Sequence, residues 1–257
     1  MKAVLRWALM LFLAGLGLQL FFVLRIAAMT VVDPQSTAFQ RSGAWRIATA
    51  GSTSGKASAG LRWRQEWVPY SRISDHLKRA VIASEDDGFV DHDGVDWDAI
   101  EKAWEKNARA EELAERRALR QSAGKFHLRP NARPPKVVGG STITQQLAKN
   151  LLLSGERTLL RKGQEFVLAL ALEQLLDKRR ILEIYLNSVE WGEGVFGAEA
   201  AAQHYHRKRA AQLTPYEAAR LAVMLPRPRH YEKLPHSGYL ASRAHTILAR
   251  MRHAELP

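Results

Sequence analysis

The stretch EFVLALALEQLL, residues 165–176, decides the fold class predicted for this chain. Every residue from Phe166 to Leu172 is apolar, a pattern typical of a helix that is buried on nearly all sides. Similar helical patterns, separated by Gly, Pro and capping residues, continue along the chain from Ser71 onward. The sequence therefore predicts a single, mainly α domain.

The expected elements follow from hydrophobic periodicity and from breaker residues. RWRQEWV, residues 62–68, has some strand character, which Pro69 ends. The small residues of 51–60 predict a flexible loop, and the basic, Pro- and Gly-rich segment 122–140 predicts another. Helices are expected near residues 74–85, 97–120, 141–153, 161–176, 178–187, 197–205, 215–225 and 237–253.

A membrane anchor is predicted at the start of the chain. WALMLFLAGLGLQLFFVL, residues 7–24, is apolar except for Gln19. At about 1.5 Å per residue this run spans roughly 27 Å, just enough to cross a bilayer core. It is longer than the apolar region of a cleaved signal peptide, which favours an uncleaved anchor, although residues 26–28 leave cleavage open. Lys2 and Arg6 favour a cytoplasmic N-terminus, and basic residues beyond the span weaken that preference.

Composition limits the classes of protein and of partner. The 257 residues are 46% hydrophobic and 25% charged, as in ordinary globular proteins, so wholesale disorder is not expected. The chain has no cysteine, which excludes disulfides and thiolate metal sites. Its formal net charge is +12, and a basic excess behind an anchor suggests an anionic partner: nucleic acid, acidic lipid or a phosphorylated substrate.

The acidic stretch SEDDGFVDHDGVD, residues 84–96, is unexpected in so basic a chain. A calcium loop of the EF-hand type would need a closing glutamate, which this stretch lacks. A metal site at Asp91 and Asp93 stays open, while a solvated turn is the simplest reading for most of the six carboxylates.

Glu85 differs from its acidic neighbours. It is expected at the C-terminal end of a helix whose dipole disfavours negative charge, and Asp86 and Asp87 add like-charge repulsion. Both effects raise the pKa of the Glu85 carboxyl towards neutrality, where a general base works best.

GGSTITQQLAKNLLL, residues 139–153, is the second candidate stretch. Two glycines lead into Ser141 or Thr142 as N-cap, and Thr142 with Gln145 fits a capping box. A glycine-led helix start can also bind an anion. The stretch is dense in polar side chains, which favours a site over a plain helix start: Ser141, Thr142, Thr144, Gln145, Gln146, Lys149 and Asn150.

Glu165 is the second candidate carboxylate. Arg161 and Lys162 precede it by four and three residues, on the same helical face, and should keep it ionised. A structural ion pair in a core helix is the alternative. With Lys149 and Arg157, these cations form a basic cluster suited to phosphate.

Other features are weaker. Ser122-x-x-Lys125 matches a transpeptidase motif by chance, because its partner motifs are missing downstream. His204-x-His206 has no third ligand, so zinc is not expected. Four further residues are read as core and turn positions: Tyr185, Asn187, Trp191 and Phe196.

Taken together, five motifs resemble the peptidoglycan glycosyltransferase family. They are Glu85-Asp86-x-x-Phe89-x-x-His92-x-Gly94-Val95-Asp96, GGSTITQQLAKN, Arg161-Lys162-x-x-Glu165, KRRILEIYLN and AARLAVMLPRPRHY. They run in the family order over roughly residues 63–252. WGEGVFGAEAAAQHY, and the lack of a C-terminal transpeptidase domain, resemble the monofunctional members. One departure is the segment 107–136, which is longer than the family pattern.

The resemblance implies a mainly α, lysozyme-like fold of two lobes behind a transmembrane helix. It divides the chain into a cytoplasmic stub and anchor (1–28), a juxtamembrane connector and loop (29–60) and a glycosyltransferase domain (61–257). Its implied reaction joins lipid II units into β-1,4 glycan with inversion and releases undecaprenyl diphosphate. The implied location is the bacterial inner membrane, with a single span and the catalytic domain on the periplasmic side.

The resemblance also assigns roles to residues. Glu85 would take the proton from the acceptor 4-hydroxyl. Glu165 would either orient the basic cluster or assist departure of the diphosphate indirectly. Substrate binding falls to Ser141, Thr142, Gln145, Gln146, Lys149, Asn150, Arg157, Arg161 and Lys162. Asp86, Phe89, His92, Gly94 and Asp96 would support the first motif. No cofactor or metal site is firmly expected, with Mg²⁺ or Mn²⁺ as an optional helper of the diphosphate.

The expected partners are lipid II, the growing lipid-linked glycan, membrane lipids and proteins of cell-wall synthesis or division. Two alternatives remain open. A lysozyme-like hydrolase or lytic transglycosylase would share the fold and a catalytic glutamate, but it would not need the basic cluster. A membrane-anchored scaffold or nucleic-acid binder is the other, and no groove-reading motif supports nucleic acid.

Overall fold

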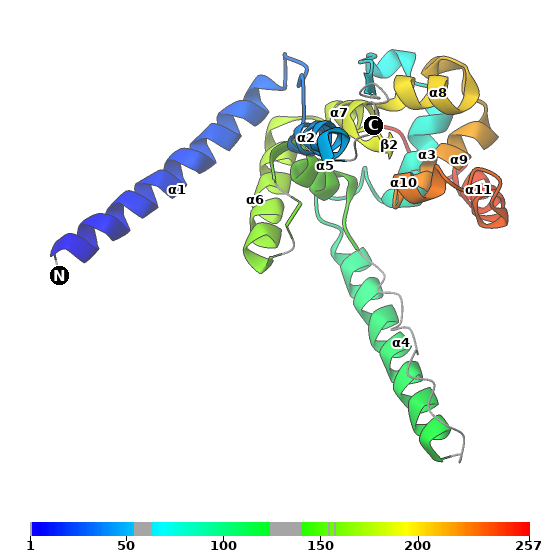
Figure 1. Ribbon diagram of the computed structural model, residues 1–257, viewed down its shortest axis with the longest axis horizontal. Coiled ribbons are helices and arrows are strands. Elements are labelled where there is room, and N and C mark those ends of the chain that lie inside the picture. Colours follow the sequence, from blue (N-terminus) through cyan, green and yellow to red (C-terminus); the bar gives the residue numbers. More distant parts are fainter. Residues whose placement is uncertain (1, 54–62, 124–139, 154, 157) are drawn as a thin grey trace. The chain divides into compact units, whose positions relative to one another are not determined.

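α-Helices dominate the computed structural model, which describes residues 2–53, 63–123, 140–153, 155–156 and 158–257 (Figure 1). The first half holds α1 (Lys2–Ala28), α2 (Ala38–Thr53), α3 (Asp75–Glu85), α4 (Trp97–Ala123) and α5 (Ile143–Leu152). The second half holds α6 (Leu159–Leu175), α7 (Lys178–Ser188), α8 (Ala198–His206), α9 (Pro215–Met224), α10 (Pro228–Tyr231) and α11 (Gly238–Arg250). Short 3₁₀ turns, η1 (Tyr70–Arg72) and η2 (Ala210–Gln212), complete the helical elements.

Each of the expected helices is present, with ends shifted by a few residues. The expected strand is confirmed in part, as β1 (Arg64–Gln65). It pairs in parallel with β3 (Val195–Phe196), which pairs antiparallel with β2 (Glu190–Gly192). This small sheet joins the start of the domain to the turn before α8.

Helix α2 was not predicted. It lies in the segment expected to be a connector and includes residues 51–53, the first three of the expected flexible loop; residues 54–60 lie outside the described part of the chain. Its start is capped reciprocally, because the Gln40 N–H donates to Thr37 Oγ1 at 3.0 Å and the Thr37 N–H donates to Gln40 Oε1 at 2.8 Å. Buried Gln40 also donates to the Ser188 carbonyl, so tertiary contacts hold this helix.

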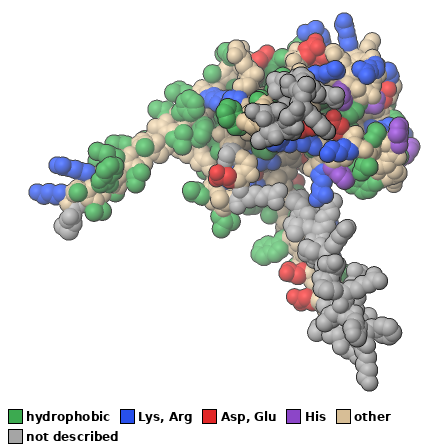
Figure 2. Space-filling model, in the orientation of Figure 1, with side chains coloured by type: hydrophobic (Ala, Val, Ile, Leu, Met, Phe, Trp, Pro, Cys, Tyr) green, Lys and Arg blue, Asp and Glu red, His purple; other side chains and the backbone are tan. Residues whose placement is uncertain are grey.

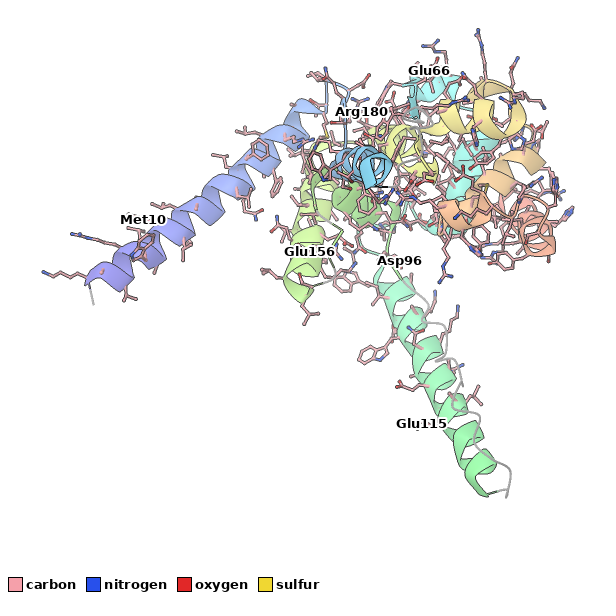
Figure 3. All side chains as sticks on the ribbon, viewed as in Figure 1. Met10, Glu66, Asp96, Glu115, Glu156 and Arg180 are labelled. Atoms are coloured by element: carbon pink, nitrogen blue, oxygen red, sulfur yellow. The ribbon has the colours of Figure 1, made fainter. Side chains whose placement is uncertain are left out.

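Helix α1 is long and apolar enough to cross a membrane, by length and composition. Residues 2–18 are all exposed, and hydrophobic side chains cover most of the helix, with basic ones at its N-terminal tip (Figure 2). The last turns behave differently, because Phe22, Ile26 and the following Met29 belong to the buried core. Arg180 of α7, labelled in Figure 3, holds this end. Its Nε donates to the Met29 carbonyl at 2.8 Å.

The prediction that α6 is buried on nearly all sides is wrong. Leu168, Ala169 and Leu172 are fully buried, whereas Val167 is 50% exposed and Leu170 is 38% exposed. The helix therefore buries one face in the core and leaves an apolar face outside it. A helix that is apolar all round needs apolar surroundings on every side, but those surroundings need not be protein.

The described chain forms two compact units, residues 1–95 with 142–257, and residues 96–141. The larger unit holds the core, in which α9 packs against α3 and α11, and α5 packs against α6 and α7. The smaller unit contains α4, whose first turn is capped by Asp96, since the Ala99 N–H donates to Asp96 Oδ1 at 2.8 Å. Most of the loop expected at 122–140 lies outside the described residues.

Candidate active site

Helix α3 carries the first candidate carboxylate. Ser74 caps it by accepting a hydrogen bond from the His76 N–H at 3.2 Å, and Leu77, Val81 and Ile82 fix its apolar face in the core. The helix ends at Glu85, as the sequence predicted. The carboxylate is therefore presented from a rigid element, at the point where the chain turns away.

The Glu85 carboxylate accepts two neutral hydrogen bonds. Gln146 Nε2 donates to Glu85 Oε2 at 3.1 Å, and Ser84 Oγ donates to Oε1 at 3.3 Å. The Gln146 amide is itself oriented, because the Tyr185 hydroxyl donates to its Oε1 at 3.0 Å. This short chain of side chains from α7, α5 and α3 points the glutamine amide at the carboxylate.

Burial raises the pKa of the Glu85 carboxyl above its ordinary value of 4.5. The neighbouring Asp86 raises the pKa further, while the hydrogen bonds from Gln146 and Ser84 and the charge of Arg243 lower it. The direction agrees with the sequence prediction. The main cause is desolvation, however, and not the like-charge repulsion that sequence reasoning put forward.

Asp86 ties the turn after α3 to the start of α5. Its side chain is buried, and its Oδ2 accepts a hydrogen bond from the Ile143 N–H at 2.8 Å. Its Oδ1 lies 2.8 Å from His92 Nε2. Burial acts to lower the pKa of His92, but the hydrogen bond and charge of Asp86 outweigh it, and the net pKa is raised. Asp86 and His92 thus hold the turn that follows Glu85.

Gly94 is the tightest point of this turn. Its φ is +86°, and a Cβ there would lie 2.9 Å from Glu173 Cγ on α6. Its carbonyl accepts a hydrogen bond from Thr142 Oγ1 at 2.7 Å. Fully buried Phe89 lies edge-on to the His92 ring at 6.4 Å between centroids. Phe89, His92 and Gly94 therefore lie together in the turn that follows Glu85.

The polar stretch at α5 divides into two sets. Thr142 is the N-cap; it is buried, and its hydroxyl accepts from the Gln145 N–H while donating to Gly94. Gln145 is buried as well. By contrast Gln146, Lys149 and Asn150 are half-buried and share one helical face, as positions i, i+3 and i+4. That face carries the α5 side chains available to a ligand, and half-buried Ser141 precedes the cap.

Glu165 on α6 has the opposite surroundings to Glu85. Its buried carboxylate pairs with Arg161 Nη1 at 2.8 Å and with Lys162 Nζ at 2.6 Å. The Arg161 Nε is buried and has no hydrogen-bond partner among the described residues. Thr158 caps the helix by accepting from the Arg161 N–H at 3.2 Å. Arg157, the remaining expected cation of this cluster, lies outside the described residues.

Sequence reasoning missed several groups at the site. Tyr185, assigned to the core, is fully buried but uses its hydroxyl to orient Gln146. Glu173 accepts from Thr144 Oγ1 at 2.6 Å and pairs with Lys178 at 2.9 Å, which joins α5, α6 and α7. The need of a buried tyrosine hydroxyl for a partner was the available signal. Nothing in the local sequence pointed to Glu173.

Asp91 and Asp93 are exposed, as in a solvated turn. Within the described ranges, no group of three or more His, Asp or Glu side chains is placed to hold a metal ion. The described residues therefore do not form a recognisable site for Mg²⁺ or Mn²⁺.

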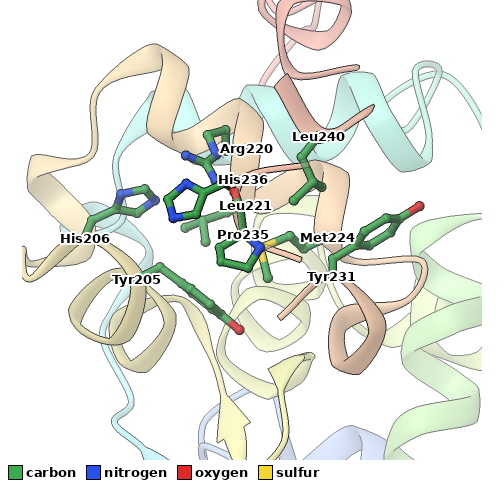
Figure 4. A pocket seen from close by; sticks show the side chains of 9 residues that line it. All are labelled: Tyr205, His206, Arg220, Leu221, Met224, Tyr231, Pro235, His236 and Leu240. Atoms are coloured by element: carbon green, nitrogen blue, oxygen red, sulfur yellow. Dashed lines mark hydrogen bonds between the residues drawn. The ribbon is translucent and has the colours of Figure 1, made fainter. Parts of the chain in front are cut away.

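A separate pocket lies among the C-terminal helices (Figure 4). Two of its polar side chains are hydrogen-bonded within the protein: the Tyr205 hydroxyl donates to the Trp191 carbonyl at 2.9 Å, and Arg220 Nη2 donates to the Pro235 carbonyl at 2.6 Å. Burial lowers the pKa of His206. Its lining residues are Tyr205, His206, Arg220, Leu221, Met224, Tyr231, Pro235, His236 and Leu240.

The chain matches the family model described as Transglycosylase over residues 54–116 and 128–252. It is 50% identical over 244 residues to a biosynthetic peptidoglycan transglycosylase of Burkholderia thailandensis, covering 95% of this chain and 84% of the relative. It is 48% identical over 258 residues to the protein of that name from Herminiimonas arsenicoxydans, covering 100% of this chain and 99% of the relative. A Bordetella pertussis protein of the same name is 51% identical over 225 residues, 88% of this chain and 82% of the relative.

The chain therefore belongs to the transglycosylase family. This confirms the family expected from the five sequence motifs, and with it the mainly α, lysozyme-like fold class and the assignment as a glycosyltransferase.

Proposed function

We propose that this chain polymerises lipid II into linear β-1,4 glycan strands of peptidoglycan. The reaction inverts the configuration at the donor anomeric carbon and releases undecaprenyl diphosphate. The observation that carries the proposal is the pair of unlike glutamates. Glu85 is a half-buried carboxylate with a raised pKa and neutral donors, whereas Glu165 is locked between two cations. The names of the relatives support the peptidoglycan substrate class.

Glu85 acts as the general base. Its raised pKa lets it accept a proton near neutral pH, and Gln146 holds the carboxylate in one orientation. As the acceptor 4-hydroxyl attacks the donor C1, its proton passes to Glu85. The bond between C1 and the phosphate oxygen breaks, and the electron pair leaves with the diphosphate.

The basic cluster binds the leaving diphosphate. A diphosphate departs as an anion, so it needs cations more than it needs a proton. Arg161 and Lys162 supply charge, and the unpartnered Arg161 Nε is a further donor of this site. Glu165 orients the two cations, and Lys149 and Asn150 extend the binding surface along α5. Arg157 and Ser141 complete the proposed set.

The remaining motif residues hold the base. Asp86, Phe89, His92 and Gly94 support the turn after Glu85, and Asp96 starts α4. Thr142 and Gln145 were expected to bind substrate, but we assign them to this supporting role instead, because both are buried and the Thr142 hydroxyl is bonded within the protein.

The proposed topology is a single span in the bacterial inner membrane. Residues 1–28 form the stub and anchor, 29–60 the juxtamembrane segment, and 61–257 the catalytic domain on the periplasmic side. The basic surplus suits an anionic lipid substrate and anionic membrane lipids. Proteins of cell-wall synthesis or division are the proposed protein partners. We do not propose nucleic acid as a partner.

The test is a polymerisation assay on the full chain in lipid vesicles containing lipid II, with and without added Mg²⁺. The expected products are muramidase-sensitive glycan and undecaprenyl diphosphate. A parallel incubation with purified sacculi decides the alternative: release of soluble muropeptides without polymerisation would overturn the proposal in favour of a glycan-cleaving enzyme.

A further inference from the structure

The anchor helix meets the catalytic domain along one stripe. Gln19, Phe22 and Ile26 recur at helical spacing on α1, and the stripe continues to Met29 just beyond it. Phe22, Ile26 and Met29 are buried in the core, and Gln19 is half-buried, whereas residues 2–18 are exposed. Going along α1 towards its N-terminus, Gln19 is therefore the last residue that is partly buried against the domain.

That last contact is a reciprocal amide pair with Gln164 on α6. Gln19 Nε2 donates to Gln164 Oε1 at 2.8 Å, and Gln164 Nε2 donates to Gln19 Oε1 at 3.0 Å. Gln19 is also the one strongly polar side chain between Trp7 and Leu24. A polar side chain in such a run is costly in lipid unless it is paired, so this pairing has a strong energetic reason.

Length places the pair at membrane depth. The free apolar part of α1, residues 7–18, spans only about 18 Å at ~1.5 Å per residue, well short of a hydrocarbon core about 30 Å thick. In the proposed topology, in which α1 spans the membrane, the docked turns that follow therefore also lie within the bilayer. α6 fits this environment, because Leu159 is 92% exposed, Leu160 is 88% exposed and Val167 is 50% exposed.

The partner residue sits beside the basic cluster. Gln164 immediately precedes Glu165, the carboxylate that holds Arg161 and Lys162. A contact that fixes Gln164 against the anchor also fixes the height and rotation of this part of α6 relative to the membrane.

We infer that the Gln19–Gln164 pair is a membrane-embedded latch that positions the donor-binding cations of α6 at the lipid surface. Both glutamines are positioning residues, since they act through Arg161, Lys162 and Glu165. The inference rests on the proposed function, in that the cluster is taken to bind a lipid-linked diphosphate.

A double-mutant cycle in lipid vesicles tests the latch. Gln19→Leu and Gln164→Leu each leave one amide unpaired, and each should raise the apparent KM for lipid II about threefold to tenfold with kcat within twofold. The double variant removes both amides, so its KM should lie closer to that of the wild type than either single variant. Gln174→Leu, on an exposed position of α6, is the matched control.

The KM readout separates positioning from folding. A merely structural contact would reduce the amount of active enzyme, and so kcat, while leaving KM unchanged. Single variants without an effect on KM, or effects that simply add in the double variant, would overturn the latch.

Cross-linking measures the contact without any activity. The chain has no cysteine, so Gln19→Cys with Gln164→Cys can be bridged by a short bis-methanethiosulfonate reagent in vesicles. Phe21→Cys with Gln164→Cys, on the opposite face of α1, is the control. Equal cross-linking of the two pairs would overturn the latch and leave the proposed function standing. Efficient cross-linking in a chain that fails to polymerise lipid II would instead remove the function.

Discussion

The two candidate glutamates, Glu85 and Glu165, have the same type of side chain but entirely different hydrogen-bond partners. Glu85 ends α3 and, among the described residues, accepts side-chain hydrogen bonds from two neutral groups, Gln146 and Ser84. Glu165, in the second turn of α6, has a cation on each carboxylate oxygen. Burial raises the pKa of Glu85 by more than its hydrogen bonds and the charge of Arg243 lower it, and the raised pKa suits Glu85 to take a proton. Glu165 instead lies buried between Arg161 and Lys162 and holds their charged groups in place.

The comparison shows that burial alone does not assign a catalytic role. A buried carboxylate becomes a base or a structural anion according to the charge of its hydrogen-bond donors. The two surroundings are built separately, one by the α3–α5–α7 contacts and the other within a single turn of α6. Substitutions should therefore separate them.

The largest effect is expected from Glu85→Gln. Loss of the general base should lower kcat for glycan polymerisation about 10²–10⁴-fold. The fold should be retained, because glutamine keeps the shape and one hydrogen bond to Gln146. Asp87→Asn, at an exposed neighbour, is the matched control. Polymerisation by Glu85→Gln at near the wild-type rate, measured with lipid II in vesicles, would remove Glu85 from this role.

Arg161→Ala should act on donor binding. It removes a charged donor from the diphosphate site and should raise the KM for lipid II by roughly tenfold to a hundredfold, with a smaller change in kcat. Lys208→Ala, which breaks the 2.8 Å pair with Glu217 elsewhere, controls for the loss of a cation. A fall in kcat with an unchanged KM would contradict the binding role.

The two glutamates should also respond oppositely in stability. Because burial raises the pKa of Glu85, ionising its carboxyl lowers the free energy of unfolding as the pH rises from the ordinary value of 4.5 through the raised pKa. Glu85→Gln should therefore be more stable than the wild type above this window and lose that gain below pH 4.5.

Glu165→Gln removes the carboxylate partner of Arg161 and Lys162. It should lower the free energy of unfolding by about 1–3 kcal/mol at neutral pH.

Thermal unfolding of the full chain at pH 4, 6 and 8 measures both effects. If Glu85→Gln and Glu165→Gln changed the stability at pH 8 in the same direction, the predicted difference between the two glutamates would be wrong.

The smallest effect is a shift of the pH profile by Gln146→Leu. The Gln146 hydrogen bond lowers the pKa of Glu85, so its loss should raise that pKa. The acidic limb of kcat/KM would then move to higher pH, because the base is protonated over a wider range. Ser84→Ala should move the limb in the same direction by less, since its hydrogen bond is the weaker cause. A limb that moves to lower pH in Gln146→Leu would exclude this orientation of the amide.

Much of this site was predictable because its signals are local. The end of α3 at Glu85, the Thr142 cap of α5 and the spacing that places Arg161 and Lys162 on Glu165 each depend on a few consecutive residues. Hydrophobic periodicity placed most helices in the same way. Such features depend on backbone geometry that repeats within one turn, so they can be read before the chain is folded.

The failures involve residues far apart in the chain. Gln146 and Tyr185 are separated by 39 positions, and Gln40 reaches Ser188 across 148. The same holds for the exposed face of α6, because periodicity detects apolar side chains without saying whether protein or lipid covers them. Gln19 is a further case, because the sequence shows an isolated glutamine in an apolar run, whereas its partner Gln164 lies 145 positions away.

By itself the sequence determined the helical class, an N-terminal helix apolar enough to span a membrane, the family motifs and the two candidate carboxylates. The tertiary structure alone decided why they differ. Desolvation, and not the adjacent aspartates, is the main reason for the raised pKa of Glu85, and only the packing of α3, α5 and α7 sets how far a carboxylate is removed from water. Gly94 illustrates both kinds of information. Its place in the motif is visible in the sequence, but the contact that requires a glycine there is made by α6.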